Sequence, residues 1–427
     1  MNLMVFLEGS ASIFSSYNLI IESSLIIIAS FFFTEISKRT NIPSVLLLII
    51  MGICLQYAIA ANGAVFNFFP ILELLGITGL IMIVLEAALE LKLDREKTKP
   101  ILVSLLIALV GLALSAWAAA TIIHYFYPEM TTTQSWVYAT PLSILSSAII
   151  IPSVAALRQD KKEFHIYEST FSDILGIMMF YFLVGNDGGE SSGGNVVGFF
   201  GNLFVTIIVS FIASYIIVLI FQKIKSHVKL FLLISILLLL YAVGKKLHLS
   251  SLIIILIFGL LIANINVFFP KKLKRFIDID KINEIYDELH IITLETAFVV
   301  RTFFFVIFGI TISIKSLFDV KVALISAAII LSIYLIRYGL LRASYGKDIF
   351  PQAYIAPRGL ITILLFYAIP ESMQLDTFNS GILLFVIIAT SIIMTISMIL
   401  EKNRSEKAIN NARANPVDTI KWQAKKI

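Results

Sequence analysis

Apolar runs of about 20 residues recur along almost the whole chain, and they limit the possible folds more than any other feature. A helix needs about 20 mostly apolar residues to cross the hydrocarbon core of a bilayer. Charged residues make up 14% of the chain, against roughly 25% in soluble domains, and they collect between the runs. With 59% hydrophobic residues, the chain could not cover itself with a polar surface in water. We therefore expect an all-α integral membrane protein.

The apolar runs predict about 13 transmembrane helices. We expect them at 17–36, 42–60, 71–91, 101–126, 136–157, 168–185, 196–221, 229–247, 250–268, 290–314, 321–342, 351–370 and 379–400. Residues 1–400 then form a transmembrane domain, and residues 401–427 form a short basic cytoplasmic tail. The sequence has no H-E-x-x-H, no G-x-S-x-G and no phosphate-binding glycine loop, so we expect neither an enzyme nor a cofactor.

The lysines and arginines predict the orientation of the chain. They gather in alternate connections and in the tail, and few lie in the connections expected on the other side: Lys245, Lys246, Lys315 and Lys321. The N-terminus is therefore expected outside and the C-terminus in the cytoplasm, in a prokaryotic inner (plasma) membrane. The excess of 33 Lys and Arg over 28 Asp and Glu reflects this topology, and the expected surroundings are lipid, with no nucleic acid.

A glycine-rich segment, 185-GNDGGESSGGN-195, divides the chain near its middle and is expected to be an external loop. Six expected spans precede it, and a linking span and six more follow it. This order gives the two sets of six opposite orientations, as inverted repeats require. We expect a first repeat at 1–185, a linking helix at 196–221 and a second repeat at 229–400.

The fifth span of each expected repeat, helix 5 and helix 12 in chain order, combines prolines with polar or small residues. Proline removes a helical hydrogen bond and frees a carbonyl group, and paired broken helices mark binding sites in transporters. A simple proline kink is the alternative for either span alone. The residues concerned are Pro141, Ser143, Ser146, Ser147 and Pro152 in 136–157, and Pro351, Pro357 and Gly359 in 351–370.

Seven ionisable residues fall within the expected spans, where each costs roughly 2.5–3.5 kcal/mol on insertion scales. They are Glu86, Glu168, Asp173, Glu295, Arg301, Arg337 and Arg358. Four carboxylates against three guanidiniums leave one negative charge, which suits one monovalent cation or one proton. The alternative for each acid is a carboxylate at a helix end in reach of water. For Arg301 and Arg358 the alternative is an ion pair that holds helices together.

Helical spacing separates two acids of the segment 168-ESTFSD-173. Ser169 and Asp173 are four residues apart and share a face of the helix. Glu168 points about 140° away from Asp173 around the helix axis. Asp173 and Ser169 are therefore expected to face a cavity, while Glu168 pairs with another helix.

Several segments resemble, in the right order, the monovalent cation:proton antiporter superfamily, that is, the sodium/proton exchanger family. The resemblance covers nearly the full length of the chain. The segments are 78-TGLIMIVLEAALELKL-93, 168-ESTFSDILGIMMF-180, 303-FFFVIFG-309, 334-YLIRYGLL-341 and 357-PRGLITILLFYAIP-370. The chain departs from the family at Ser172, where Asn or a second Asp is usual, and in 145-LSSAIII-151, where T-D-P is common.

The resemblance implies roles for individual residues. Asp173 would bind the cation or the proton, and Glu86 and Ser169 would be further ligands of a transported sodium ion. Ser172 is also expected among the cation- or proton-binding residues, and the break at Ser146 and Ser147 would supply backbone oxygens. Glu168 would pair with Arg337, and Arg301, Arg358 and Glu295 receive no role.

The function implied is exchange of a monovalent cation, sodium first, for a proton by alternating access, in a homodimer. We expect electroneutral exchange, because Ser172 replaces any second acid and the arginine at 337 keeps its proton at all accessible pH values. A potassium/proton antiporter is the nearest alternative. A channel or membrane sensor on the same scaffold, with Asp173 structural, also remains open.

Overall fold

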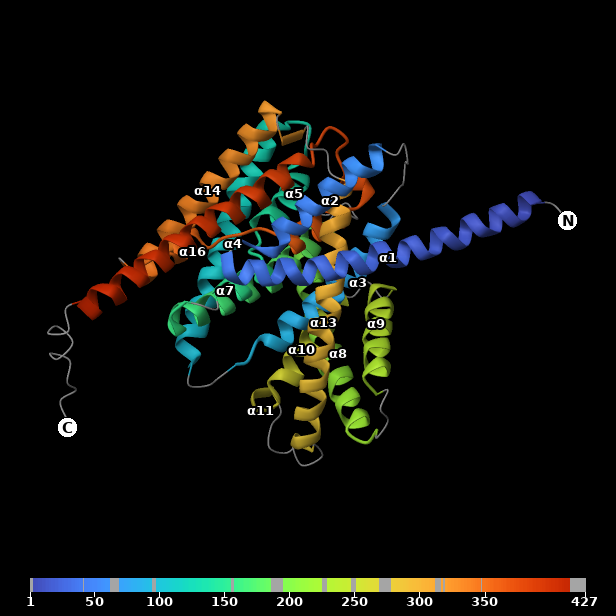
Figure 1. Cartoon of the computed structure of the whole chain (residues 1–427). Helices are drawn as coiled ribbons and strands as arrows, with labels where there is room; N and C mark the ends of the chain where they lie inside the picture. The colour runs from blue at the N-terminus through green and yellow to red at the C-terminus, as the bar shows by residue number, and fades with distance from the viewer. Residues whose placement is uncertain are drawn as a thin grey trace.

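The computed structural model of the chain is helical throughout the part that it describes (Figure 1). It describes residues 3–40, 42–61, 69–93, 97–154, 157–185, 195–224, 229–246, 251–268, 278–311, 316–317, 319–346 and 348–414. Most of the expected external loop, residues 186–194, and the end of the expected tail, residues 415–427, lie outside the described residues.

Every expected membrane span overlaps a helix or a pair of short helices. The elements are α1 (Leu3–Thr40), α2 (Ser44–Ala61), α3 (Phe69–Glu90), α4 (Thr98–Phe126), α5 (Thr132–Ser143), α6 (Ser147–Ser153), α7 (Gln159–Gly185), α8 (Asn195–Phe221), α9 (Lys229–Lys246), α10 (Ser251–Ala263), α11 (Ile265–Phe268), α13 (Ile279–Thr311), α14 (Val320–Tyr345), the 3-10 turn η4 (Gln352–Tyr354), α15 (Leu360–Tyr367), the 3-10 turn η5 (Glu371–Met373) and α16 (Gly381–Ala414). Among the described residues, seven helical segments are long and apolar enough to cross a membrane. Shorter apolar helices lie at some of the other expected spans. The all-α membrane fold is confirmed, and the number 13 stays a prediction.

Two boundaries differ from the sequence prediction. The helix α16 continues to Ala414, past the expected start of a loose tail at residue 401, because Glu, Lys and Ala favour helix even in a polar stretch. The first half of the expected span 351–370 is the single turn η4 followed by extended backbone, so α15 alone is the helical part of this broken element.

The helices pack mainly as two groups, which we call the α3 group and the α7 group. The α3 group contains α1, α2, α3, α8, α9, α10 and α13, and the α7 group contains α4, α5, α6, α7, α14, α15 and α16. Figure 1 shows α14 and α16 side by side on one side of the molecule, and α8, α10 and α13 on the other. The two groups meet where α3 contacts α7 and α15.

Glycines set the close packing within the α3 group. A Cβ atom on Gly52 of α2 would overlap the carbonyl oxygen of Val306 and lie 2.9 Å from Cα of Gly309 in α13. A Cβ atom on Gly79 of α3 would lie 2.7 Å from Val300 of α13. On the other side of α3, a Cβ atom on Gly259 of α10 would lie only 2.6 Å from Cβ of Ala88. Backbones approach closely at small residues in membrane helices, and α3 is held in this way by two neighbours.

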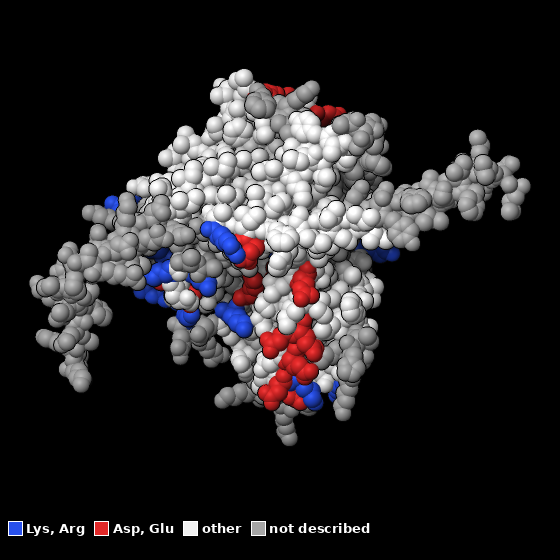
Figure 2. All heavy atoms as spheres, viewed as in Figure 1, with Lys and Arg blue, Asp and Glu red and all other residues white. Residues whose placement is uncertain are grey.

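The surface agrees with a membrane environment. Many large apolar side chains are exposed, including Phe31, Leu106, Trp117, Phe204 and Phe231. On the face shown in Figure 2, a broad band without charged side chains separates acidic residues at the top from mixed charges in the lower half. A band of this kind is what the hydrocarbon core of a bilayer requires.

The glycine contact between α2 and α13 gives a stability prediction. Gly52→Ala should lower the free energy of unfolding by about 1–3 kcal/mol, because the added methyl group has to displace backbone atoms of α13. The measurement is the melting temperature of the detergent-purified protein. Gly339→Ala on α14 is the control, since no described atom lies within 4 Å of its added Cβ atom. Equal melting temperatures for the two variants would contradict the packing described.

Candidate cation site

Two interrupted elements cross at the centre of the α7 group. The helix α5 ends at Ser143, and α6 begins at Ser147 after an extended connection. The backbone N–H of Ser146 donates a hydrogen bond of 3.0 Å to the carbonyl oxygen of Pro357 in the other break. A Cβ atom on Gly359 would lie 2.5 Å from Oγ of Ser146, so glycine is needed where the two breaks cross. The expected pairing of two broken elements is therefore present in the structure.

The guanidinium of Arg358 joins the two breaks. It donates hydrogen bonds to the carbonyl oxygens of Leu142 (2.9 Å) and Ser143 (3.2 Å), at the end of α5, and to that of Ala356 (2.7 Å). These are carbonyl groups that an uninterrupted helix would have used itself. Arg358 is buried, and no ion pair of the described residues includes it. Its positive charge instead faces the carbonyl end of α5, where a cation is stabilised.

Asp173 lies beside the break, on α7, with 1% of its surface exposed. Neither of its carboxylate oxygens has a hydrogen-bond partner among the described residues. The hydroxyl and the backbone N–H of Ser147 are close to the carboxylate but do not complete a hydrogen bond with good geometry. Glu86 of α3 is near enough for the two carboxylates to repel each other. Asp173 is thus a buried carboxylate that lacks a fixed counter-ion in the described structure.

The serines of α7 have separate partners. The hydroxyl of Ser169 donates to the carbonyl oxygen of His165 at 2.7 Å, which leaves its lone pairs available to a cation. The hydroxyl of Ser172 accepts a hydrogen bond of 3.0 Å from the backbone N–H of Leu145, in the break between α5 and α6. Ser172 therefore fixes α7 against the break, in the place where the family usually has an amide or acid.

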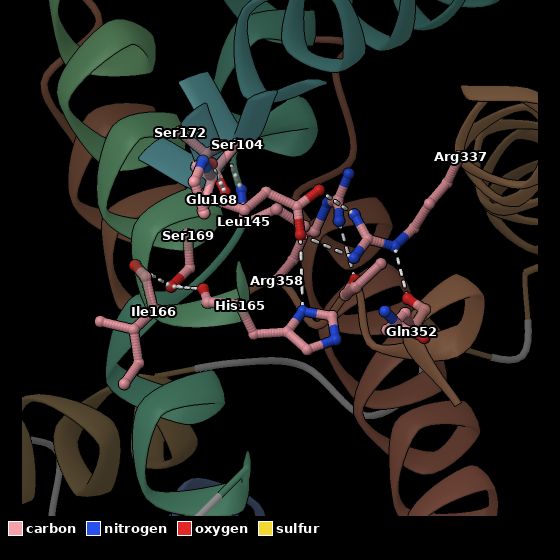
Figure 3. Close-up of polar contacts among 12 residues, drawn as sticks. Ser104, Leu145, His165, Ile166, Glu168, Ser169, Ser172, Arg337, Gln352 and Arg358 are labelled. Atoms are coloured by element: carbon pink, nitrogen blue, oxygen red, sulfur yellow. Dashed lines mark hydrogen bonds and ion pairs between the residues drawn. The ribbon is translucent and has the colours of Figure 1, made fainter. Parts of the chain in front are cut away.

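Glu168 and Arg337 form a buried ion pair between α7 and α14 (Figure 3). Two guanidinium nitrogens of Arg337 donate to the two oxygens of Glu168 at 2.7 and 2.8 Å. The third nitrogen, Nε, donates to the carbonyl oxygen of Gln352 at 3.0 Å. The paired geometry is the strongest that arginine and a carboxylate can form, and it holds the two helices in one register.

His165 is a residue that the sequence reasoning missed. Its ring is fully buried, and Nδ1 lies 3.4 Å from the Glu168 carboxylate (Figure 3). The spacing gives the signal that could have found it, because His165 and Glu168 are three residues apart and share a helix face. The oxygen of Glu168 that His165 approaches, Oε2, is also the one that accepts a hydrogen bond from Nη2 of Arg337.

A second ion pair lies inside the α3 group. Nη2 of Arg301 on α13 donates a hydrogen bond of 3.1 Å to Glu86 on α3. Both side chains line a cavity of about 400 Å³. Its polar lining also includes Ser30, Thr34, Ser37, Glu90, Ser147, Ser153 and Thr302. The cavity reaches Ser147, which lies beside Asp173, while Asp173 itself is buried behind this lining.

Glu295 is not brought to this site. Its side chain on α13 is exposed, and it does not line the cavity. Glu90 lines the cavity, so the described interior holds the acids Glu86, Glu90, Glu168 and Asp173 beside the three arginines 301, 337 and 358. The expected surplus of one negative charge stays a prediction. In the described part of the chain, no three His, Cys, Asp or Glu side chains converge as a metal cluster would. The oxygen donors around Asp173 are therefore carboxylate, hydroxyl and backbone groups.

The fold of this chain resembles that of solved antiporter structures. A solved structure of the sodium proton antiporter MjNhaP1 from Methanocaldococcus jannaschii at pH 8 superposes with a TM-score of 0.63 at 20% identity, covering 90% of this chain and 96% of that chain. An electron-microscopy structure of the same antiporter gives 0.64 at 19% identity, covering 95% and 97%. No curated protein sequence matches significantly. The sequence pattern of the family "Sodium/hydrogen exchanger, transmembrane" matches residues 26–402. The chain belongs to the sodium/hydrogen exchanger family.

The match to the family confirms the resemblance seen in the sequence, and it establishes the general function of the chain. The sodium/hydrogen exchanger family is one of integral membrane transporters, not of enzymes, and the chain is a cation/proton antiporter. The solved antiporters show the fold of this chain, because their identity is too low to transfer more. The roles of individual residues rest on the contacts described above.

The ion pair between α7 and α14 gives the second prediction. Glu168→Gln or Arg337→Gln alone should lower the free energy of unfolding by about 3–5 kcal/mol, because each leaves a buried charge uncompensated. The double variant Glu168→Gln with Arg337→Gln should regain part of this loss. Melting temperatures of the four proteins provide the measurement. Strictly additive shifts would show that the two side chains are not coupled.

Proposed function

We propose that this exchanger transports sodium ions against protons by alternating access, with Asp173 as the group that carries either ion. One observation carries the proposal: Asp173 is a buried carboxylate at the contact between the two helix groups, and no described group compensates its charge. A buried carboxylate without a counter-ion is costly, and either a proton or a cation removes that cost.

Competition couples the two ions. A proton makes the Asp173 carboxyl group neutral and removes its attraction for sodium, while a bound sodium ion occupies the oxygens that a proton needs. The two ions therefore exclude each other at one site, and a transporter that changes sides only in a loaded state exchanges them. Hard cations such as sodium favour oxygen ligands. Glu86, the hydroxyl of Ser169 and the break around Ser146 and Ser147 offer such oxygens close to Asp173.

The position of Ser172 argues for a supporting role. Its hydroxyl already accepts the N–H of Leu145 in the described structure, so we assign it to holding the break and not to the cation. Arg358 supports the same break by its bonds to Leu142 and Ser143. Both residues thereby fix the distance between Asp173 and the oxygens of the break.

The packing into two groups supports alternating access. Asp173 belongs to the α7 group, and the facing cavity is lined largely by α1, α2, α3 and α13 of the α3 group. We propose that the α7 group moves against the α3 group and carries the ion site with it. The α7 group takes three spans from the proposed first repeat, 1–185, and three from the second, 229–400, with 196–221 as the linking helix between the repeats. The proposed orientation has the N-terminus outside, in a prokaryotic inner membrane, and the proposed assembly is a homodimer.

The central test replaces the carboxylate. Asp173→Asn should abolish sodium/proton exchange, because the amide cannot take up and release a proton at accessible pH values, while leaving the melting temperature near that of the wild type. Exchange is measured as a sodium-driven pH change inside proteoliposomes. Glu295→Gln is the matched control, since this acid is exposed outside the cavity, and it should exchange at the wild-type rate. An active Asp173→Asn variant would remove Asp173 from the site.

The same assay separates the other candidate functions. Sodium, potassium and lithium are supplied in turn, and the largest proton flux is expected with sodium. A response to potassium alone would indicate a potassium/proton antiporter. A cation current without a coupled proton flux would indicate a channel, and no flux of any kind would indicate a sensor.

We further propose that exchange is electroneutral. Glu168 and Glu86 each have an arginine partner, whereas Asp173, with 1% of its surface exposed, has neither an ion pair nor a hydrogen bond among the described residues. One cation then replaces one proton, and no net charge moves. The exchange rate should be unchanged when valinomycin and a potassium gradient impose a membrane potential, once potassium is shown not to be a substrate. A rate that changes several-fold with voltage would show a second proton carrier, for which Glu86 is the candidate.

A further inference from the structure

The two buried ion pairs of the structure are built differently. Arg337 meets Glu168 with two short hydrogen bonds, and the side chains are 8% and 2% exposed. Arg301 meets Glu86 through one nitrogen at 3.1 Å, and its side chain is 20% exposed to the large cavity. The first geometry locks two helices together. The second leaves an arginine that can part from its carboxylate into an adjoining space.

The residues on both sides of Arg301 fix where its side chain begins. Val300 packs against Gly79 of α3, where a Cβ atom would lie only 2.7 Å away. The hydroxyl of Thr302 shares a hydrogen bond of 2.6 Å with that of Ser30 on α1. The backbone of α13 is therefore held on both sides of Arg301, and the guanidinium is tethered within reach of Glu86.

The pair also lies within one helix group, while Asp173 lies in the other. Movement of the α7 group against the α3 group would separate Asp173 from Glu86 but would leave Arg301 beside Glu86. Arg301 can therefore neutralise Glu86 whenever the transported cation is elsewhere. When a cation sits between Glu86 and Asp173, the guanidinium and the cation compete for the same carboxylate.

We propose that Arg301 is a tethered cation that competes with the transported cation for Glu86 and thereby sets the apparent affinity of the exchanger for that cation. This inference rests on the proposed function, because it takes the space between Glu86 and Asp173 as the cation site. Arg301 acts here through Glu86 and is a residue that determines affinity without touching the transported ion.

The test measures the sodium concentration at half-maximal exchange in proteoliposomes at one fixed pH. Arg301→Gln should lower this concentration by about fivefold, the size of one partly exposed charged contact. Arg301→Lys should lower it less, because the strongly hydrated ammonium on a shorter side chain keeps the charge but competes less well. Sodium-dependent stabilisation of the purified protein against heat, which needs no transport, should show the same order of apparent affinities.

The Glu86→Gln background shows whether Arg301 acts through Glu86. In this background Arg301→Gln should cause no further change in the half-maximal concentration, although the maximal rates differ. An unchanged or raised concentration in the single Arg301 variants, or a full effect that persists beside Glu86→Gln, would overturn the proposal. If Arg301→Gln does not fold, Arg301→Lys decides alone by the same criteria in both backgrounds.

The outcome is distinguishable from a failure of the proposed function. If the wild-type protein exchanges sodium and Asp173→Asn does not, an unaltered Arg301→Gln affinity refutes the role of Arg301 and leaves the function standing. If Asp173→Asn exchanges like the wild type, the cation site itself is wrong. Should the wild type prefer potassium, the same series is measured with potassium.

Discussion

The three hydrogen bonds from Arg358 to Leu142, Ser143 and Ala356 are the interaction on which the rest of the site depends. An interrupted helix at membrane depth exposes carbonyl and amide groups that neither lipid nor a neighbouring turn can satisfy. One guanidinium occupies three of the carbonyls at once, Pro357 accepts the N–H of Ser146, and Ser172 accepts the N–H of Leu145. With these groups paired, the break can stay open beside Asp173 without collapsing into helix or requiring water.

The charges of the interior then differ in how firmly each is compensated. Glu168 is held by two hydrogen bonds from Arg337, Glu86 by one hydrogen bond from Arg301, and Asp173 by no group of the described chain. This gradation follows the division into two helix groups. The firm pair lies wholly within the α7 group, the loose pair within the α3 group, and the uncompensated acid at the boundary between them. If the two groups move as proposed, a charge at their boundary cannot keep a fixed protein partner, and a diffusible ion can serve in its place.

The sequence allowed prediction of those features that depend on a single segment. The length of each apolar run locates a helix, because the thickness of the bilayer acts on every run separately. The prolines located the two broken elements only approximately: Pro357 lies in the break before α15, whereas Pro141 and Pro152 lie inside α5 and α6, on either side of the break at 144–146. The family pattern added the likeness to sodium/proton exchangers, which the match over residues 26–402 confirms.

Features that depend on the meeting of distant segments were not predictable in the same way. Arg301 and Glu86 are 215 residues apart, and the residues around either one give no sign that the other is its partner. The bond from Leu145 to Ser172 depends on the path of the break, which the sequence does not specify. Glu295 was counted with the interior because the apolar run around it hides which face of α13 turns outward. The contact between His165 and Glu168 was predictable, because residues three apart in a helix lie on the same face.

The glycine contacts on both sides of α3 have a consequence for how motion in this protein is measured. Gly79 of α3 packs against the side chain of Val300 in α13, and Gly259 of α10 packs against Ala88 of α3, so Glu86 lies between two close helix contacts. The position of Glu86 is thus fixed relative to α10 and α13 of the α3 group. A probe on α3 would therefore share the frame of α10 and α13, and a change in its distance to a probe on α7 would measure the proposed movement between the two helix groups.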